Sequence, residues 1–252
     1  MKKQLNKNLI ERFSRQIILK NIGILGQKKI LASKVLVVGV GGLGSSAAEF
    51  LVRSGVGKLG IIDYDKVSLS NLHRQSLYET LHVGKSKVIV IKKILNRINP
   101  NTKVQTYNLK LNNINFKKII KKYDYIVDGS DNFKTKFLLN DYCLKYKKIL
   151  VTGAISKFDG HIFTFNFKNK KLPCLRCFYQ EAEPDDDLFN CEAEGILGTV
   201  ASIVGTIQAN EILKKILNIG QSLNGYILIL NLLDLNFRKV KIKKYKHCIC
   251  NK

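Results

Sequence analysis

Apolar residues follow two alternating patterns along the first half of the chain. Short, continuous runs rich in Val, Ile and Leu are typical of strands that are buried on both faces of a parallel sheet. Between these runs, apolar residues recur every three or four positions, which is typical of helices packed on such a sheet. This order predicts a doubly wound, mostly parallel α/β sheet with right-handed crossovers. The strands are expected at Lys34–Val38, Lys58–Asp63, Lys103–Tyr107 and Tyr125–Asp128, and the helices at Ser45–Ser54, Lys85–Ile98 and Phe116–Lys122.

The pattern changes in the second half. Two alternating runs, Ile149–Ser156 and His161–Phe167, flank a short turn and predict an antiparallel pair of strands. A long helical pattern at Thr199–Leu217 is followed by strand-like runs at Gly225–Asp234 and Asn236–Lys244. We therefore predict that the sheet continues into antiparallel strands in the C-terminal half.

No linker-like segment divides the chain, so we expect a single domain over residues 1–252. It would comprise an N-terminal helical segment at 1–30, with a helix at Asn8–Leu19, followed by a parallel half at 31–150 and an antiparallel half at 151–252.

The chain is strongly basic, with 43 Lys and Arg residues against 19 Asp and Glu residues and a formal net charge of +24. The lysines are scattered among many Asn and Ile residues, which indicates a compositional bias rather than a nucleic-acid surface. The apolar runs are shorter than the roughly 18 residues of a membrane-spanning helix, and the first residues lack the apolar core of a signal peptide. We therefore expect a cytoplasmic protein with neither a membrane nor a nucleic-acid partner.

A glycine-rich turn follows the first predicted strand. Residues Gly39–Gly44 (GVGGLG) have the G-x-G-x-x-G spacing and lie between a strand and a helix. Glycines in this place let the backbone approach a phosphate, which the N-terminus of the helix attracts. Asp63 ends the next strand, where a carboxylate can bind ribose hydroxyls in a Rossmann-like fold. The sequence therefore predicts a nucleotide-binding fold.

Polar and cationic residues beyond the second strand favour a nucleoside triphosphate over a nicotinamide cofactor. Arg74 and the lysines Lys85 and Lys87 supply positive charge, and Ser70 and Asn71 supply hydrogen-bonding groups, of the kind that three charged phosphates need. Farther along, DGSDN ends another predicted parallel strand, where such folds place their chemistry. A carboxylate in this segment can hold Mg²⁺ beside the phosphates.

Four motifs together carry a family resemblance. GVGGLG, DYDKVSLSNLHRQ, VGKSK and DGSDN occur in this order at residues 39–44, 63–75, 83–87 and 128–132. They resemble the MoeB/ThiF family, relatives of the adenylating halves of ubiquitin-activating enzymes. The resemblance implies an ATP-dependent adenylyltransferase that activates the C-terminal carboxylate of a ubiquitin-like sulfur-carrier protein ending in Gly-Gly. Pyrophosphate would be released, and the carrier would serve molybdopterin or thiamine-thiazole synthesis, two branches that the sequence does not separate.

The resemblance also implies roles for single residues. Gly41 and Gly42 would contact the nucleotide, and Asp63 would hold its ribose. The phosphates would be faced by Asn71, Arg74 and Lys87.

By the same resemblance, Asp131 would hold Mg²⁺ and Asn132 would lie near the base or the ribose. Arg15 would reach the γ-phosphate from the other subunit, which implies a homodimer with two composite sites. Because the attacking carboxylate is already ionised, catalysis would consist of positioning and charge neutralisation, without a general base.

The cysteines suggest a metal site. Cys174 and Cys177 form a C-x-x-C pair, and Cys248 and Cys250 form a C-x-C pair at the end of the chain. Two such thiolate pairs can make a closed structural Zn²⁺ site. The MoeB/ThiF family has C-x-x-C twice, so either the C-x-C pair binds in a tighter loop or His247 replaces Cys248. A metal-free cluster of buried thiols is the remaining alternative.

Two further cysteines lie outside this pattern. Cys191 matches the place where ThiF-type proteins carry a cysteine that links covalently to the carrier or to sulfur, and we include it among the catalytic candidates. Cys143 lies in a helical apolar pattern and is expected to be a core residue.

Two other functions fit parts of the sequence. A related enzyme type, the tRNA threonylcarbamoyladenosine dehydratase, adenylates a small carboxylate on RNA, and the basic charge would suit it. A nucleotide-binding scaffold without catalysis would be expected to lack Arg74, Lys87 or Asp131, and this chain has all three.

Overall fold

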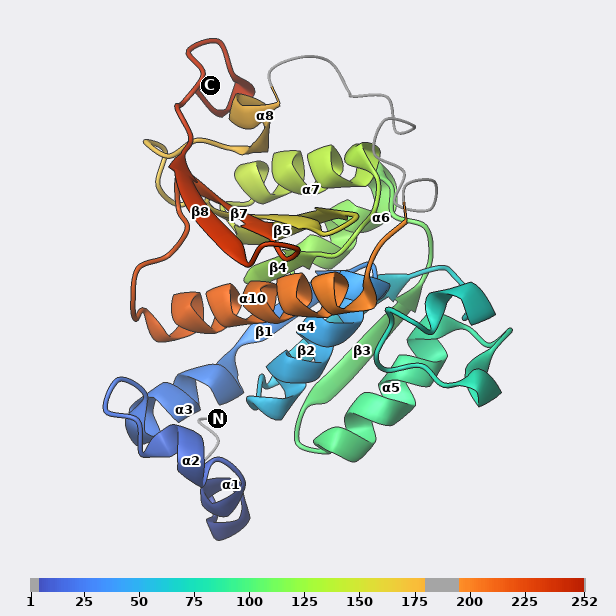
Figure 1. The fold of residues 1–252 in the computed structure, drawn as a ribbon. Helices are drawn as coiled ribbons and strands as arrows, with labels where there is room; N and C mark the ends of the chain where they lie inside the picture. Colours follow the sequence, from blue (N-terminus) through green and yellow to red (C-terminus); the bar gives the residue numbers. More distant parts are fainter. Residues whose placement is uncertain (1–4, 180–194, 252) are drawn as a thin grey trace.

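The structure is a computed structural model that describes residues 5–179 and 195–251 (Figure 1). Eight strands form one sheet in the order β3-β2-β1-β4-β5-β6-β7-β8. The first five strands run parallel, and β5 to β8 pair antiparallel, so the predicted mixed sheet is confirmed. The strands are β1 (Lys34–Val38), β2 (Lys58–Asp63), β3 (Lys103–Asn108), β4 (Tyr125–Asp128), β5 (Ile149–Ser156), β6 (Asp159–Asn166), β7 (Tyr226–Asn231) and β8 (Asn236–Lys241).

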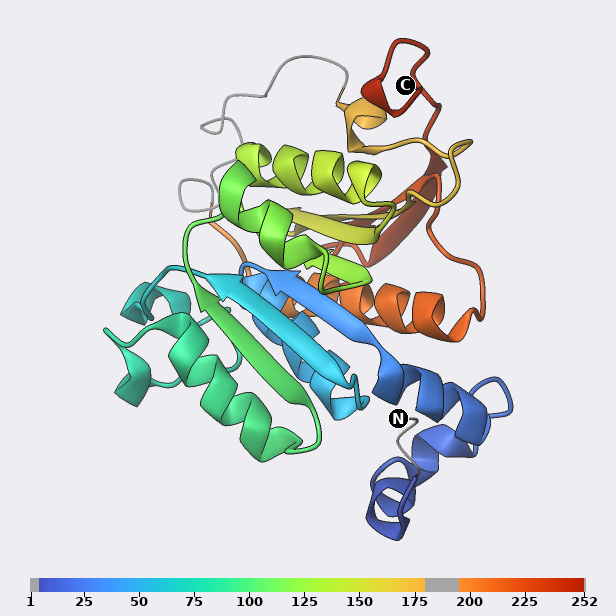
Figure 2. The same cartoon turned by 180° about the vertical axis from the view of Figure 1, so that it is seen from behind.

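Helices cover both faces of the sheet, as Figures 1 and 2 show from opposite sides. One face carries α4 (Gly42–Arg53), α5 (Lys87–Ile98) and α10 (Gly198–Leu217), and the other carries α6 (Asn113–Ile120) and α7 (Phe133–Lys145). Each face buries its own apolar cluster. The other helices of the described residues are α1 (Lys7–Arg12), α2 (Ser14–Ile17), α3 (Gly23–Ala32), α8 (Leu175–Phe178) and the 3₁₀ turns η1 (Leu69–Asn71), η2 (Thr80–His82) and η4 (Ile249–Asn251).

The N-terminal segment differs from the prediction. The single helix expected over Asn8–Leu19 is interrupted at Phe13, between α1 and α2. The Phe13 side chain is 3% exposed, and its ring packs so closely on Gly55 that a Cβ there would lie 2.6 Å from Phe13 Cζ. Burial of this ring on the body of the protein therefore accompanies the break in the helical pattern. A further helix, α3, lies largely within the predicted helical segment at 1–30, although the sequence predicts no separate bounds for it.

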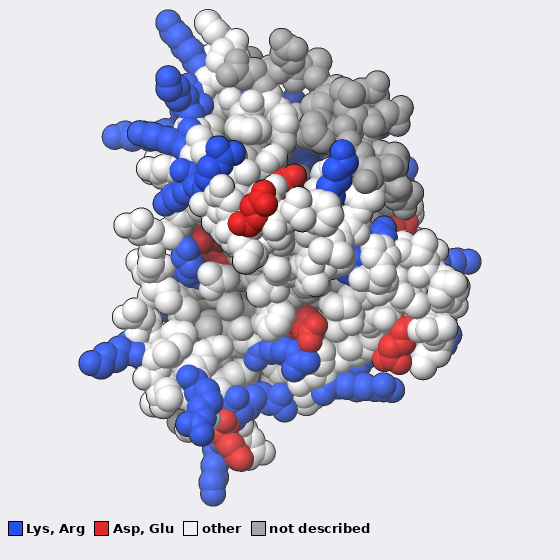
Figure 3. Space-filling view, in the orientation of Figure 1, with Lys and Arg blue, Asp and Glu red and all other residues white. Residues whose placement is uncertain are grey.

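Basic side chains are widely spread over the described residues. On the face drawn in Figure 3, Lys and Arg side chains extend from the top of the molecule to its bottom. Within residues 5–179 and 195–251, no helix combines the length and apolar character needed to cross a bilayer.

The long helix α10 is fixed to the antiparallel half of the sheet by a buried carboxylate. Glu211 is 2% exposed, and it accepts hydrogen bonds from Thr164 Oγ1 of β6 at 2.9 Å and from the Leu223 backbone N–H at 3.0 Å. Lys214 forms an ion pair with it. Burial alone would raise the pKa of Glu211, but the hydrogen bonds from Leu223, Lys214 and Thr164 outweigh it, and the pKa is lowered.

We predict that Glu211 makes stability depend on pH. Because its pKa is lower in the folded protein, charged Glu211 stabilises fully above the ordinary value of 4.5 and loses this effect as the pH falls through the folded pKa. Glu211→Gln should lower the free energy of unfolding by about 1–3 kcal/mol near pH 7. Urea unfolding should show the difference between wild type and variant shrinking below pH 4.5, and a difference that stays constant down to pH 3 would contradict the assignment.

Candidate functional site

The glycine turn joins β1 to α4 at the carboxyl end of the parallel strands. Gly39 has a φ of +78°, a conformation that favours glycine. A Cβ on Gly44 would lie 1.8 Å from the Gly39 carbonyl oxygen, so this approach of helix to turn also requires glycine. Gly41 and Gly42 begin the helix between these two positions. The turn therefore presents the free N–H groups of the first turn of α4, which can bind an anion.

Asp63 holds the turn from the end of β2. Its Oδ2 accepts a hydrogen bond from the Val40 N–H at 2.8 Å, and its Oδ1 accepts one from the Asp65 N–H at 2.8 Å. Asp63 is 8% exposed, and burial raises the pKa of its carboxyl. The structure thus places Asp63 directly against the glycine turn, and its predicted contact with a ribose stays a prediction.

The cationic residues lie on the segments that follow β2. Lys87 is the first residue of α5, and its Nζ forms an ion pair with Asp65 Oδ2 at 2.9 Å. Arg74 Nη1 donates to the Ser70 carbonyl at 3.0 Å and lies 2.8 Å from His73 Nε2. A Cβ on Gly42 would lie 3.7 Å from Arg74 Cγ, so the Arg74 side chain lies close to the glycine turn. The same Cβ would lie 2.9 Å from Ala201 Cβ, so α10 also packs on this turn.

A hollow of about 310 Å³ lies between the segment at residues 72–76 and the first turn of α10. Asn71, which ends η1 just before this segment, is buried, with 8% of its surface exposed. Polar side chains from both walls line the hollow, including those of Arg74, Ser76, Thr199 and Ser202.

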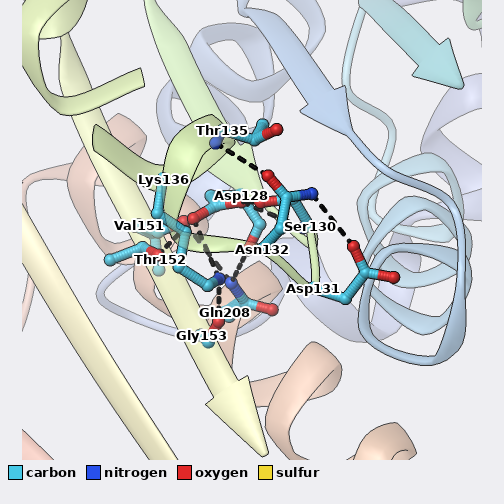
Figure 4. Close-up of polar contacts among 10 residues, drawn as sticks. All are labelled: Asp128, Ser130, Asp131, Asn132, Thr135, Lys136, Val151, Thr152, Gly153 and Gln208. Atoms are coloured by element: carbon cyan, nitrogen blue, oxygen red, sulfur yellow. Dashed lines mark hydrogen bonds and ion pairs between the residues drawn. The ribbon is translucent and has the colours of Figure 1, made fainter. Parts of the chain in front are cut away.

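The DGSDN segment forms a loop between β4 and α7, shown in Figure 4. Asn132 caps α7, because its Oδ1 accepts a hydrogen bond from the Thr135 N–H at 2.8 Å. Asp131 is exposed and its Oδ1 accepts a hydrogen bond from Asn132 Nδ2 at 3.1 Å. Within the described part of the chain, no ion pair involves Asp131. Its carboxylate is therefore available for a cation.

Sequence reasoning missed the buried residues beneath this loop. Asp128 is fully buried and forms an ion pair with Lys136 of α7, with Nζ and Oδ2 3.2 Å apart. Thr152 of β5 donates to the same carboxylate, and Gln208 of α10 donates to the Asp128 carbonyl at 2.7 Å. One signal was available in the sequence: Lys136 falls at helical spacing with the buried Phe133 and Phe137, a position where a charge needs a partner.

Arg15 lies away from the other predicted site residues of its own chain. It is exposed on α2, and its neighbours dock at the far end of the fold. Arg12 Nη1 donates to the Ile98 carbonyl at the end of α5, and Gln16 Nε2 donates to the Ser54 carbonyl beyond α4. Figures 1 and 2 show α1 and α2 beside the amino ends of the parallel strands, opposite the glycine turn.

The four predicted metal-binding cysteines lie together. The Sγ atoms of Cys174 and Cys248 are 3.4 Å apart, those of Cys177 and Cys250 are 3.5 Å apart, and all four lie within 4.8 Å of one another. A disulfide would need about 2 Å between sulfurs, whereas tetrahedral coordination at about 2.3 Å from a metal needs sulfurs about 3.8 Å apart. This cluster of four cysteines can therefore hold a metal ion.

The geometry favours Cys248 over His247 as the fourth ligand. The His247 side chain is exposed and its ring packs edge-on against Tyr245, with centroids 5.7 Å apart, whereas Cys248 is 6% exposed within the cluster. The C-x-C pair contributes both sulfurs because η4 turns the chain end back toward α8. Cys143 is fully buried in α7, as predicted. Cys191 lies outside the described residues, so its catalytic role stays a prediction.

Sequence comparison identifies the family. The model of the ThiF family matches residues 13–252. This chain belongs to the ThiF family. It is 38% identical over 245 residues to the sulfur carrier protein adenylyltransferase of Thermus thermophilus, which covers 96% of this chain and 90% of that protein. It is also 40% identical over 243 residues to the adenylyltransferase and sulfurtransferase MOCS3 of Aedes aegypti, covering 96% of this chain and 55% of that relative's length.

Solved structures of ThiF-like fold agree with the architecture. The structure of E. coli MccB with MccA-N7isoASN has a TM-score of 0.83 at 22% identity, covering 98% of this chain and 76% of that one. The structure of E. coli MccB with ATP has a TM-score of 0.81 at 21% identity, covering 95% of this chain and 74% of that one. At these identities the likeness concerns the fold.

We predict that Cys248, and not His247, is needed for metal binding. Cys248→Ser should remove bound metal from the purified protein, because a closed site of four thiolates loses one ligand. His247→Ala, the matched control one residue away, should retain it. Elemental analysis after gel filtration measures both, and loss of metal in His247→Ala with retention in Cys248→Ser would reverse the assignment.

Proposed function

We propose that this protein is an ATP-dependent adenylyltransferase that activates the C-terminal glycine carboxylate of a ubiquitin-like sulfur-carrier protein. The observation that carries the proposal is the set of groups at one edge of the sheet. A tight glycine turn, two cationic side chains and the exposed carboxylate of Asp131 lie on the segments that follow β1, β2 and β4, and we expect a triphosphate to bind among them. The 38% identity to a relative named as a sulfur carrier protein adenylyltransferase supports this substrate class.

The proposed reaction asks little covalent chemistry of the protein. A carboxylate oxygen of the carrier attacks the α-phosphorus, the bond from that phosphorus to the β-phosphate oxygen breaks, and pyrophosphate leaves with both electrons. Negative charge on the phosphates is neutralised by Arg74, Lys87 and the N–H groups at the start of α4. Asp63 would orient the ribose, with Ser70 and Asn71 beside the phosphates and Asn132 near the base or ribose.

Asp131 is proposed to hold Mg²⁺. Its carboxylate is exposed at the carboxyl end of β4, and carboxylate oxygens are the ligands that Mg²⁺ takes from proteins. Bound there, the ion would supply positive charge to the phosphates. Lys87 would have to exchange its present ion pair with Asp65 for a phosphate oxygen.

A zinc ion is proposed for the cysteine cluster. The Sγ–Sγ distances are 4.0 Å for Cys174–Cys177, 3.4 Å for Cys174–Cys248 and 3.5 Å for Cys177–Cys250, which suit four thiolates around a tetrahedral zinc ion. Bound zinc would join the chain end to the segment around Cys174 and so stabilise the C-terminal half. Paired cysteines that bind a metal rather than form disulfides are typical of a reducing compartment, which supports a cytoplasmic location.

The carrier pathway and the domain boundaries belong to the same proposal. The carrier would serve molybdopterin or thiamine-thiazole synthesis, and residues 1–252 would act as a single adenylation domain, with the nucleotide in its parallel half and the carrier against its antiparallel half.

Adenylation is tested by ATP–pyrophosphate exchange with purified carriers that end in Gly-Gly. We expect exchange that depends on the carrier and on Mg²⁺. Asp131→Ala should reduce it by about 100-fold or more, because phosphate charge would lose its neutralising ion. Exchange that requires tRNA would favour the dehydratase type of enzyme. ATP binding without exchange on any carrier would favour a nucleotide-binding scaffold.

Arg15 is proposed to act on the active site of a second copy. Within one chain α2, which carries Arg15, lies beside the amino ends of the parallel strands, whereas Asp131 follows the carboxyl end of β4, so a homodimer would have to bring Arg15 to the phosphates. An exposed arginine supplied across an interface can neutralise phosphate charge in the transition state.

Mixing two inactive variants tests this arrangement. Arg15→Ala and Asp131→Ala should each be inactive as pure proteins. After random exchange of subunits in an equal mixture, half of the dimers are mixed and each has one intact site, so about a quarter of the wild-type activity should return. A mixture that stays inactive although mass spectrometry finds mixed dimers would show that Arg15 acts within its own chain or not at all.

A further inference from the structure

The loop that carries Asp131 is fixed from below by a buried ion pair. Asp128, at the end of β4, is fully buried, and the Lys136 side chain is 7% exposed. Burying both charges is costly unless each finds several partners. Lys136 meets this requirement, since its Nζ donates to Asp128 Oδ2 at 3.2 Å and to the Gly153 carbonyl at 2.6 Å (Figure 4).

The carboxylate of Asp128 also accepts hydrogen bonds from both sides of the loop. Its Oδ1 accepts from the Ser130 N–H at 2.9 Å and from the Ser130 hydroxyl, and its Oδ2 accepts from Thr152 Oγ1. The loop therefore leaves β4 bent around the Asp128 side chain. Its other end enters α7, where Lys136 in the second turn reaches back to the same carboxylate.

This arrangement fixes both ends of the segment Asp128–Lys136 to one buried charge. Asp131 sits in the middle of the segment, and its own side chain takes no part in the buried network. The segment also touches the glycine turn: the Gly129 N–H donates to the Val38 carbonyl at 2.8 Å, and a Cβ on Gly39 would lie 2.8 Å from the Gly129 carbonyl oxygen. The position of Asp131 relative to that turn is therefore set through Asp128.

We propose that Lys136 is a positioning residue for Mg²⁺-ATP: through its ion pair with Asp128 it holds the Asp131 carboxylate at a fixed place beside the glycine turn. The inference rests on the proposed function for the identity of the ligand. It adds a residue that would touch neither the nucleotide nor the metal and would act through the shape of the loop.

The test measures ATP affinity of the full chain by calorimetry while Mg²⁺ is varied, so it needs no carrier. In Lys136→Met, the Mg²⁺ concentration for half-maximal tightening of ATP binding should rise about 10- to 100-fold, as happens when groups that support a metal ligand are removed. ATP affinity without Mg²⁺ should stay near that of wild type. Lys136→Arg, which keeps donors for both partners, should restore the Mg²⁺ response.

Two further variants separate positioning from general stability. Thr152→Val removes one donor to Asp128 at similar volume, and it should shift the Mg²⁺ midpoint in the same direction by about three- to tenfold. If Lys136→Met does not fold, the Mg²⁺ midpoint of Thr152→Val alone tests the positioning role. Lys214→Met breaks the ion pair with Glu211 in the last turns of α10, so it should lower the melting temperature without moving the Mg²⁺ midpoint.

An unchanged midpoint in the folded Lys136 and Thr152 variants would overturn the inference, as would an equal shift in Lys214→Met. A wild type whose ATP binding ignores Mg²⁺ would overturn it as well. If the midpoint shifts as expected but no carrier supports exchange, the positioning role stands and the proposed reaction fails. If exchange works while the midpoint does not move, the positioning role alone fails.

Discussion

The close approach of two backbone segments at the glycine turn is the constraint on which the site depends. The start of α4 packs so tightly on the end of β1 that any side chain on Gly44 would overlap the Gly39 carbonyl. Asp63 then closes the turn by accepting a hydrogen bond from the Val40 N–H. Because helix α4 starts at this point, its unpaired N–H groups face the same edge of the sheet at which β2 and β4 end. Asp63 at the end of β2 and the loop after β4 therefore lie at the same edge as the start of α4, although they are distant in sequence.

Charge at this edge is divided between a buried layer and an exposed layer. Asp128 and Lys136 are buried and form an ion pair, and their hydrogen bonds join the end of β4 to β5 and α7. Asp131 and Arg74 lie nearer the surface. A fully buried charge without partners would be too costly to keep, whereas a partly exposed one remains free to exchange water for a ligand. The separation lets the fold fix the loop while the groups proposed to bind the ligand stay accessible.

The C-terminal half is tied to the same loop through helix α7. Arg176, between the two cysteines of the first pair, makes two hydrogen bonds to Asp141 of α7 at 2.8 and 2.9 Å. The neighbouring Asn140 accepts the Leu175 N–H at 2.9 Å. The helix that Asn132 caps at one end thus carries the cysteine cluster near its other end. A metal in that cluster would stabilise α7 and, with it, the entry to the DGSDN loop.

The sequence alone determined the sheet, the glycine turn and the family, because these rest on local signals: β-branched runs, glycine spacing and motifs read in order. Strands β1, β2, β4 and β5 begin and end at their predicted residues. It did not determine the break at Phe13, the choice of Cys248 over His247, or the pairing of Lys136 with Asp128. The first two depend on partners distant in sequence: Gly55 beneath the Phe13 ring, and two cysteines some 70 residues upstream of Cys248. Lys136 and Asp128 are only 8 residues apart, but they pair because α7 packs back over the buried end of β4. Local propensity carries no information on such partners, so only the packed tertiary structure could select them.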